Sequence, residues 1–170
     1  MRQQTKYFAD KNISLIFSCP SVRALQSAEI ISNNKIRIEI SDLLLEVDVG
    51  DLEGKSELET SHWNQYQNTI DEWERGNVSR QFPNGESLIE IKSRLDKFIK
   101  ELNKHDFHNV IIVSHSVLIM CFLWLYGINK KPKLEANHMN RGHFSRLQFS
   151  GTKYEILEFN YFSLIPLKSP

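Results

Sequence analysis

Three polar residues, Ser114, His115 and Ser116, interrupt the apolar run VIIVSHSVLIMCFLWLY. An imidazole changes its charge near neutral pH, so a histidine can accept a proton, donate one or hold an anion. His115 is therefore a candidate for catalysis or anion binding. A buried histidine that only hydrogen-bonds to backbone would show the same pattern, and His115 taken alone does not separate the two.

Arg23 is the second candidate, in the stretch SCPSVRALQSA that follows a short apolar run. It falls in the first turn of the helix predicted for residues 21–32. A guanidinium there adds its fork of donors to the positive end of the helix dipole, and this combination can clamp a phosphate. The alternative is an ordinary surface arginine in an ion pair.

Two carboxylates complete the candidates. Glu86 stands between Gly85 and Ser87, at the start of a predicted helix. There it either complements the helix dipole or acts as a general acid, a role that requires burial or a neighbouring charge to raise its pKa. Glu46, before VDVGDLEG, is predicted to be a loop carboxylate.

Two other chemistries do not fit the spacing of the residues. A cysteine phosphatase loop has the pattern C-x5-R, and counting from Cys19 the arginine position is occupied by Leu25. The histidines of HDFH, at 105 and 108, lack a cysteine or carboxylate cluster at a metal-ligand spacing, so neither a metal nor a cofactor is predicted. Cys19 and Cys121 are predicted to be buried, reduced thiols.

The elements that would position these residues follow from hydrophobic spacing. Continuous apolar runs are typical of strands buried on both faces, whereas apolar residues three or four apart form the buried stripe of a helix. Ser87 and Glu90 form a capping-box pattern. The predicted strands are 12–18, 35–40, 109–115 and a pair around Ser150-Gly151; the predicted helices are 4–10, 21–32, one around Trp63 to Trp73, 87–102 and 117–127.

This order of elements predicts an α/β fold. Strands that alternate with helices form a mainly parallel sheet with helices on both faces, a three-layer α/β/α arrangement, here with a C-terminal antiparallel hairpin in or beside the sheet. Residues 1–170 are predicted to form a single domain. Ligands bind beyond the carboxyl ends of such strands. Residues 18–23 and 114–116 both fall at such ends, so the polar interruption at His115 is predicted to line a pocket.

The charge balance excludes some partners. The 21 Lys and Arg equal the 21 Asp and Glu, so no basic field draws nucleic acid, and any anion site must be local.

The run from Val110 to Tyr126 has about 17 residues, at the short edge of a membrane span, and its histidine and serines argue further against a membrane span. The start MRQQTKYFADK lacks the apolar core of a signal peptide. We expect a cytoplasmic protein.

Taken in order, four motifs resemble those of the histidine phosphatase superfamily, the phosphoglycerate mutase-like proteins. They are SCPSVRALQSA, LLEVDVGDLEG, PNGESLIEIKSR and VIIVSHS, and the resemblance runs from about Arg2 to Phe149. The resemblance implies a phosphoglycerate mutase-like fold and metal-free phosphoryl transfer through a phosphohistidine. By motif match, Arg23 would clamp phosphate, His115 would hold it and stabilise transition-state charge, and Glu86 would be the proton donor. The substrate would be a small phosphomonoester, with inorganic phosphate as the simplest ligand.

One family element is absent from this sequence. The superfamily's nucleophile is a histidine in an Arg-His-Gly triplet at the end of the first strand, and no such triplet occurs here; Arg141-Gly142-His143 has the same residues in the wrong order. We therefore expect a histidine-phosphatase-like domain whose first strand is missing, an N-terminally truncated chain without phosphatase or mutase activity. The alternative is a non-catalytic phosphate- or phosphoprotein-binding pseudo-enzyme.

A missing interior strand would leave backbone groups of its neighbours unpaired, at about 1–3 kcal/mol for each buried group. Three arrangements could result. The terminal hairpin could slide over to pair with residues 110–114, or a second copy could supply a strand and form a homodimer by exchange or edge pairing. Otherwise the region would be ordered only by neighbours in a crystal.

Overall fold

The computed structural model describes residues 2–56, 58–104, 107–151 and 153–162. Its main sheet has three parallel strands in the order β2-β1-β3, and a separate antiparallel pair is formed by β4 and β5. The strands are β1 (Leu15–Ser18), β2 (Ile38–Ile40), β3 (Val110–Val113), β4 (Phe144–Phe149) and β5 (Tyr154–Tyr161); the helices are α1 (Arg2–Phe8), α2 (Val22–Ser32), α3 (Thr60–Glu74), α4 (Leu88–Leu102) and α5 (Ser116–Tyr126).

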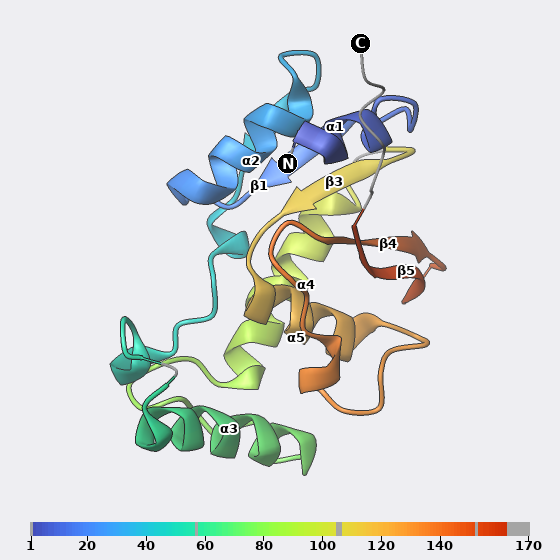
Figure 1. Cartoon of the computed structure of the whole chain (residues 1–170). Helices are drawn as coiled ribbons and strands as arrows, with labels where there is room; N and C mark the ends of the chain where they lie inside the picture. The colour runs from blue at the N-terminus through green and yellow to red at the C-terminus, as the bar shows by residue number, and fades with distance from the viewer. Residues whose placement is uncertain (1, 57, 105–106, 152, 163–170) are drawn as a thin grey trace.

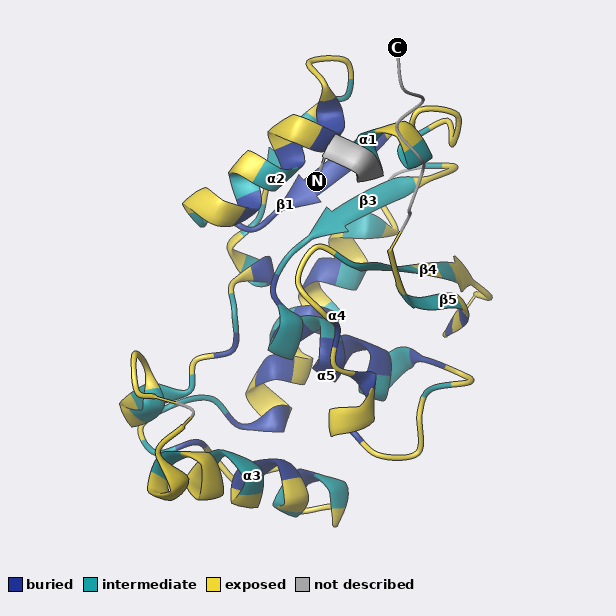
Figure 2. Ribbon diagram, viewed as in Figure 1, coloured by how far each residue is buried: buried dark blue, intermediate teal, exposed yellow. Residues whose placement is uncertain are grey.

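Helices cover both faces of the parallel sheet, with α1 and α2 on one side and α4 and α5 on the other (Figure 1). Ile16 of β1 packs with Ala28 of α2. Phe17 faces the other way and meets Phe98 of α4, with ring centroids 5.4 Å apart. A continuously apolar strand thus serves two cores at once, and β1 is buried throughout (Figure 2). The three-layer α/β/α prediction is confirmed.

Helix α4 begins as its sequence predicts. The Ser87 hydroxyl accepts from the Glu90 backbone N–H, and the Glu90 carboxylate accepts from the Ser87 backbone N–H at 2.8 Å. This reciprocal cap satisfies two N–H groups that have no partner inside the helix. The predicted stripe is buried at Leu88, Ile91 and Leu95, so α4 is anchored against the sheet from its first turn.

Helix α5 is strongly apolar, and its buried residues join two cores: Leu118, Met120, Cys121 and Phe122 pack in the main core, and Leu123 packs with Ile156 of the hairpin. Within the described ranges, no helix has both the length and the apolar character that a membrane crossing requires.

Helix α3 stands apart from the sheet (Figure 1). Its C-terminal end is held by Trp73. The indole N–H of Trp73 donates to the Arg80 carbonyl at 2.6 Å, and its ring meets Phe82 edge-on. Trp63 lies on the predicted stripe but is 40% exposed. Trp63 stacks on Tyr66, which itself stacks on Phe82. The N-terminal part of the stripe therefore covers another aromatic ring instead of entering the core directly.

The terminal hairpin forms its own sheet instead of pairing with β3, so the arrangement in which it slides over to residues 110–114 is wrong. Backbone and side-chain bonds hold it elsewhere. Ile128 N–H donates to the Tyr154 carbonyl at 2.9 Å, and the Asn129 side chain bonds both backbone groups of Ile156. In the described part of the chain, the edge of β3 away from β1 therefore has no partner strand.

Gly50 and Gly85 let the loop at residues 48–51 pack backbone to backbone against the loop at residues 83–86. Gly50 has φ +57°, and a Cβ built on it would lie 2.0 Å from the Pro83 carbonyl oxygen. The Glu86 N–H donates to the Asp48 carbonyl at 2.8 Å across the same contact. This junction fixes the chain that carries Glu86.

Left-handed backbone costs a residue other than glycine about 1–2 kcal/mol. Gly50→Ala is expected to lower the free energy of unfolding by more than this, because its methyl group would also collide with the backbone of residues 83–85. Gly54→Ala is the matched control, since Gly54 also has positive φ but its Cβ would meet no atom within 4 Å. Urea denaturation of both variants measures the difference. Equal losses would show that the collision at Gly50 is relieved without cost.

Candidate functional site

Arg23 and His115 meet at the carboxyl edge of the sheet. Arg23 lies in the first turn of α2, which follows β1, and His115 is the N-cap residue of α5, which follows β3. The adjacent strand ends are joined by the Cys19 N–H, which donates to the Val113 carbonyl. Arg23 Nε and Nη2 lie 3.2 and 3.0 Å from His115 Nδ1. The structure thus brings these two predicted residues into direct contact.

The contact fixes the proton on the imidazole. A guanidinium can only donate, so His115 Nδ1 accepts and carries no hydrogen. The neutral ring must then carry its hydrogen on Nε2, which lies 3.1 Å from Ser21 Oγ and 3.0 Å from Cys19 Sγ. Both cysteines are free and buried, as predicted. His115 therefore holds its neutral form in a cluster of four side chains.

Burial lowers the pKa of His115, and the positive charge of Arg23 lowers that pKa further. His115 is 8% exposed and stays neutral at pH 7. An anion bound to Arg23 would cancel the charge that opposes protonation. Because Nδ1 faces the Arg23 donors, the imidazole can gain a proton there when an anion draws Arg23 away.

This lowered pKa predicts a loss of stability in acid. The unfolded chain takes up the proton near pH 6.5, whereas the folded chain takes it up only below that. Between these values the unfolded state holds more protons, so the free energy of unfolding falls as the pH falls through about 6.5. Urea denaturation at several pH values should show this slope in the wild type and a smaller one in His115→Gln. Identical slopes would contradict it.

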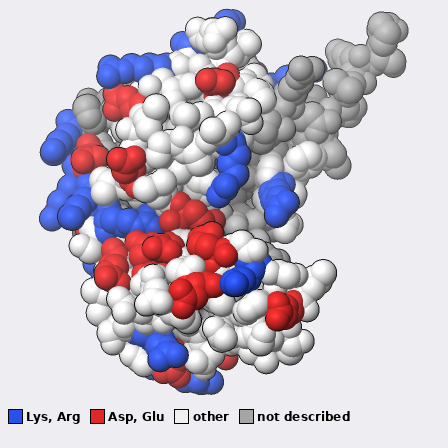
Figure 3. Space-filling model, turned by 90° about the vertical axis from the view of Figure 1, so that its left-hand side faces the viewer, with Lys and Arg blue, Asp and Glu red and all other residues white. Residues whose placement is uncertain are grey.

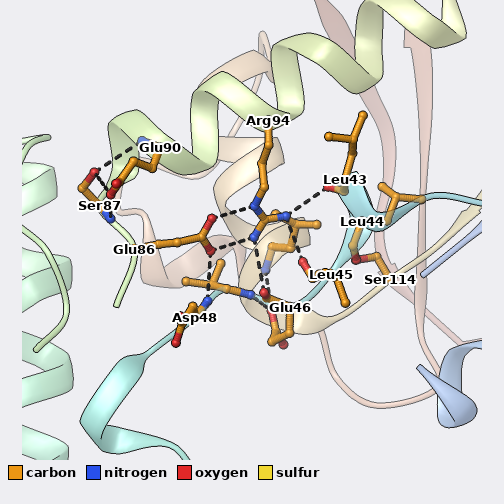
Figure 4. A network of polar contacts seen from close by, with 12 residues as sticks. Leu43, Leu44, Leu45, Glu46, Asp48, Glu86, Ser87, Glu90, Arg94 and Ser114 are labelled. Atoms are coloured by element: carbon orange, nitrogen blue, oxygen red, sulfur yellow. Dashed lines mark hydrogen bonds and ion pairs between the residues drawn. The ribbon is translucent and has the colours of Figure 1, made fainter. Parts of the chain in front are cut away.

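Glu86 is held by Arg94 rather than by the Arg23–His115 pair (Figure 4). Its Oε1 accepts from Arg94 Nε at 2.7 Å, and its Oε2 accepts from Arg94 Nη2 at 2.8 Å and from the Asp48 N–H at 2.9 Å. Among the described residues, no hydrogen bond joins Glu86 to Arg23 or His115. The structure therefore brings Arg23 and His115 together and places Glu86 in a neighbouring network.

Arg94 is the centre of that network. Beyond Glu86, it donates to the carbonyls of Leu43, Leu45 and Glu46, so all five of its N–H groups are used. The Ser114 hydroxyl donates to the Leu44 carbonyl between them at 2.8 Å. One arginine thus fixes the loop that lies against the end of β3.

The role of Arg94 could not be assigned from the sequence, although the arginine belongs to the motif PNGESLIEIKSR. The available signal is that Glu86 stands just before the predicted helix and Arg94 about two turns into it, so two opposite charges lie near the same end of the helix. Its contacts with three loop carbonyls have no sequence signature.

Glu46 is more than the loop carboxylate that its context predicts. Its Oε1 accepts from the Leu118 N–H and from its neighbour Val47 N–H, each at 3.0 Å. Burial raises the pKa of Glu46, and these bonds and the charge of Arg23 oppose that rise. The carboxyl group therefore caps the first turn of α5, directly after His115.

The surface around this edge is acidic. Figure 3 shows Asp and Glu side chains gathered on the face that the loop at residues 42–54 occupies, with Lys and Arg side chains at its margins. In the described residues, no group of three or more histidine, cysteine, aspartate or glutamate side chains could hold a metal ion. An anion would therefore be held by local donors against its surroundings.

Known proteins share this sequence pattern and fold. A "Putative phosphoserine phosphatase 2" of Hydrogenobacter thermophilus is 26% identical over 166 residues, which cover 94% of this chain and 78% of that protein. Among solved structures, Bacillus stearothermophilus YhfR has a TM-score of 0.72 at 19% identity. The match covers 95% of this chain and 81% of the YhfR chain. The α-ribazole phosphatase of Shigella flexneri has a TM-score of 0.71 at 18% identity, with coverages of 94% and 79%.

These two structures share the fold of this chain. The order of the four sequence motifs is the order expected of the superfamily that they resemble. The family model for the histidine phosphatase superfamily (branch 1) matches residues 1–161. This chain belongs to the histidine phosphatase superfamily.

Proposed function

We propose that Arg23 and His115 bind the phosphoryl group of a small phosphomonoester. Their direct contact at the ends of two parallel strands is the observation that carries the proposal. Within the described ranges Arg23 forms no ion pair with a carboxylate, so its charge is available to a ligand. A guanidinium fork beside a histidine is suited to the oxygens of a phosphate.

The catalytic roles are proposed from the family motifs. His115 would stabilise the charge that develops on the phosphoryl oxygens, and Glu86 would protonate the leaving oxygen. Arg94 fixes the orientation of Glu86 but occupies both of its oxygens, so the proton-donor role requires Glu86 to leave Arg94. The sequence holds no Arg-His-Gly triplet to supply the histidine that becomes phosphorylated. We therefore propose that this 170-residue chain binds phosphate without turning substrate over.

Two assays test the proposal. Inorganic phosphate should raise the melting temperature of the wild type through binding to the folded state, and p-nitrophenyl phosphate should not be hydrolysed above background. Phosphoserine is the first organic probe, because one similar protein carries that substrate in its name. Absence of any phosphate effect would overturn the binding proposal. Turnover that disappears in His115→Ala would overturn the proposed inactivity.

A second candidate function is recognition of a phosphorylated protein by a non-catalytic domain. The missing triplet supports it, since Arg23 and His115 remain while the nucleophile is lacking. A phosphoserine peptide should then bind more tightly than free phosphoserine. Equal affinities would favour the small phosphomonoester.

We further propose that two chains associate through the edge of β3. The support is that this apolar edge has no partner strand in the described residues, and unpaired edges accept strands from other chains. Light scattering should report a dimer, and a clean monomer would contradict the proposal. A reducing, cytoplasmic environment is also proposed, which the two free thiols support.

A further inference from the structure

A carboxylate occupies the end of α5 that would otherwise attract an anion. The first N–H groups of a helix have no partner inside it and carry positive partial charge, so they bind anions readily. Here the Leu118 N–H donates to Glu46 Oε1 at 3.0 Å, and the Val117 N–H also interacts with this carboxyl group. His115 immediately precedes this turn.

Glu46 therefore has two effects on the neighbouring site. Its oxygen satisfies the first turn of α5 and so fixes the backbone that presents His115. Its negative charge lies within electrostatic range of Arg23, the cation proposed to bind phosphate. An anion and the Glu46 carboxylate would then share one guanidinium and one helix end.

We propose that Glu46 is a positioning residue of the anion site and takes up a proton when an anion binds. This inference rests on the proposed function. The neutral acid keeps an oxygen that can accept from Leu118, so protonation removes the charge without removing the cap. Anion affinity should consequently fall as the pH rises and Glu46 ionises.

The groups around Glu46 leave Glu46 and His115 as the two that can take up a proton beside the anion site. Arg94 pairs with Glu86 and donates to the backbone carbonyl of Glu46, and Glu86 also accepts from the Asp48 N–H. From α5, the buried Cys121 thiol faces Glu46, and burial and this carboxylate together raise the pKa of Cys121, so it stays neutral. Arg23 from α2 is the cation that an anion would engage, and His115 is the other group that can take up a proton.

The test uses sulfate, which keeps its charge between pH 5 and 8, with backbone amide shifts to measure the dissociation constant. Glu46→Gln keeps an accepting oxygen and removes the charge. It should bind sulfate roughly tenfold more tightly at pH 7.5, equivalent to a coupling of about one pKa unit, and should show a weaker pH dependence. Asp42→Asn removes an exposed charge from the same loop and should behave like the wild type.

A second measurement needs no variant. The side-chain carboxyl carbon of Glu46 is titrated by NMR with and without saturating sulfate, and its midpoint should move to higher pH with sulfate. An unmoved midpoint, or a Glu46→Gln chain with wild-type affinity and pH slope, overturns this inference alone. A wild-type chain that binds neither sulfate nor phosphate overturns the proposed function as well.

Discussion

Replacing Arg94 with methionine is expected to lower the free energy of unfolding by roughly 3 kcal/mol, the lower end of the cost of removing one partner from a buried ion pair, because this pair is partly buried. The side chains of Arg94 and Glu86 are only 15% and 20% exposed. The substitution would leave the Glu86 carboxylate without its cation and three loop carbonyls without a donor. Unsatisfied buried groups add to the loss.

The control is an exposed arginine in an ion pair. Arg37 contacts Glu39 at 2.8 Å with its side chain 76% exposed, so Arg37→Met should cost less than about 1 kcal/mol. Urea denaturation at pH 7.5 compares both variants with the wild type. An Arg94→Met chain as stable as Arg37→Met would show that the network around residues 43–48 does not hold the fold together.

Arg23→Ala is expected to weaken phosphate binding by about ten- to a hundredfold, the cost of losing hydrogen bonds to a charged group. Arg23→Lys keeps the charge but not the planar fork, so it should recover only part of the affinity. Because Arg23 is exposed, neither variant should unfold the chain. This separates loss of a binding group from loss of structure.

Phosphate titrations followed by the melting temperature measure these affinities. Lys35→Ala provides a control, since it removes an exposed positive charge from the turn after α2, at the far end of that helix from Arg23. Its phosphate response should equal that of the wild type. Equal responses in Arg23→Ala and Lys35→Ala would remove Arg23 from the site.

The sequence predicted the elements whose pattern is local. The apolar run before Ser18 gives a buried strand, the stripe beginning at Leu88 gives α4, and Ser87 with Glu90 gives its cap. The meeting of Arg23 and His115 was also within reach, because adjacent parallel strands end at the same edge. These features depend on short-range spacing or on one general rule of sheet topology.

Other features depend on contacts that no local pattern encodes. The hairpin is fixed by the Asn129 side chain on the backbone of Ile156, so the choice between a place in the main sheet and a place beside it could not be predicted. Glu46 looks like a loop residue until the loop is folded against α5. The Arg94 contacts are to backbone carbonyls, which every residue has, so side-chain identity gives no sign of them.

The most direct test of the Arg23–His115 anion site observes the ring nitrogens of His115 by NMR during a phosphate titration at pH 7. Without phosphate, Nε2 should carry the hydrogen and Nδ1 should not, as the bond from Arg23 requires. Phosphate should shift both nitrogens in a saturable way toward the protonated ring, and Arg23→Ala should weaken that response. Ring resonances that stay unchanged at saturating phosphate would contradict the account.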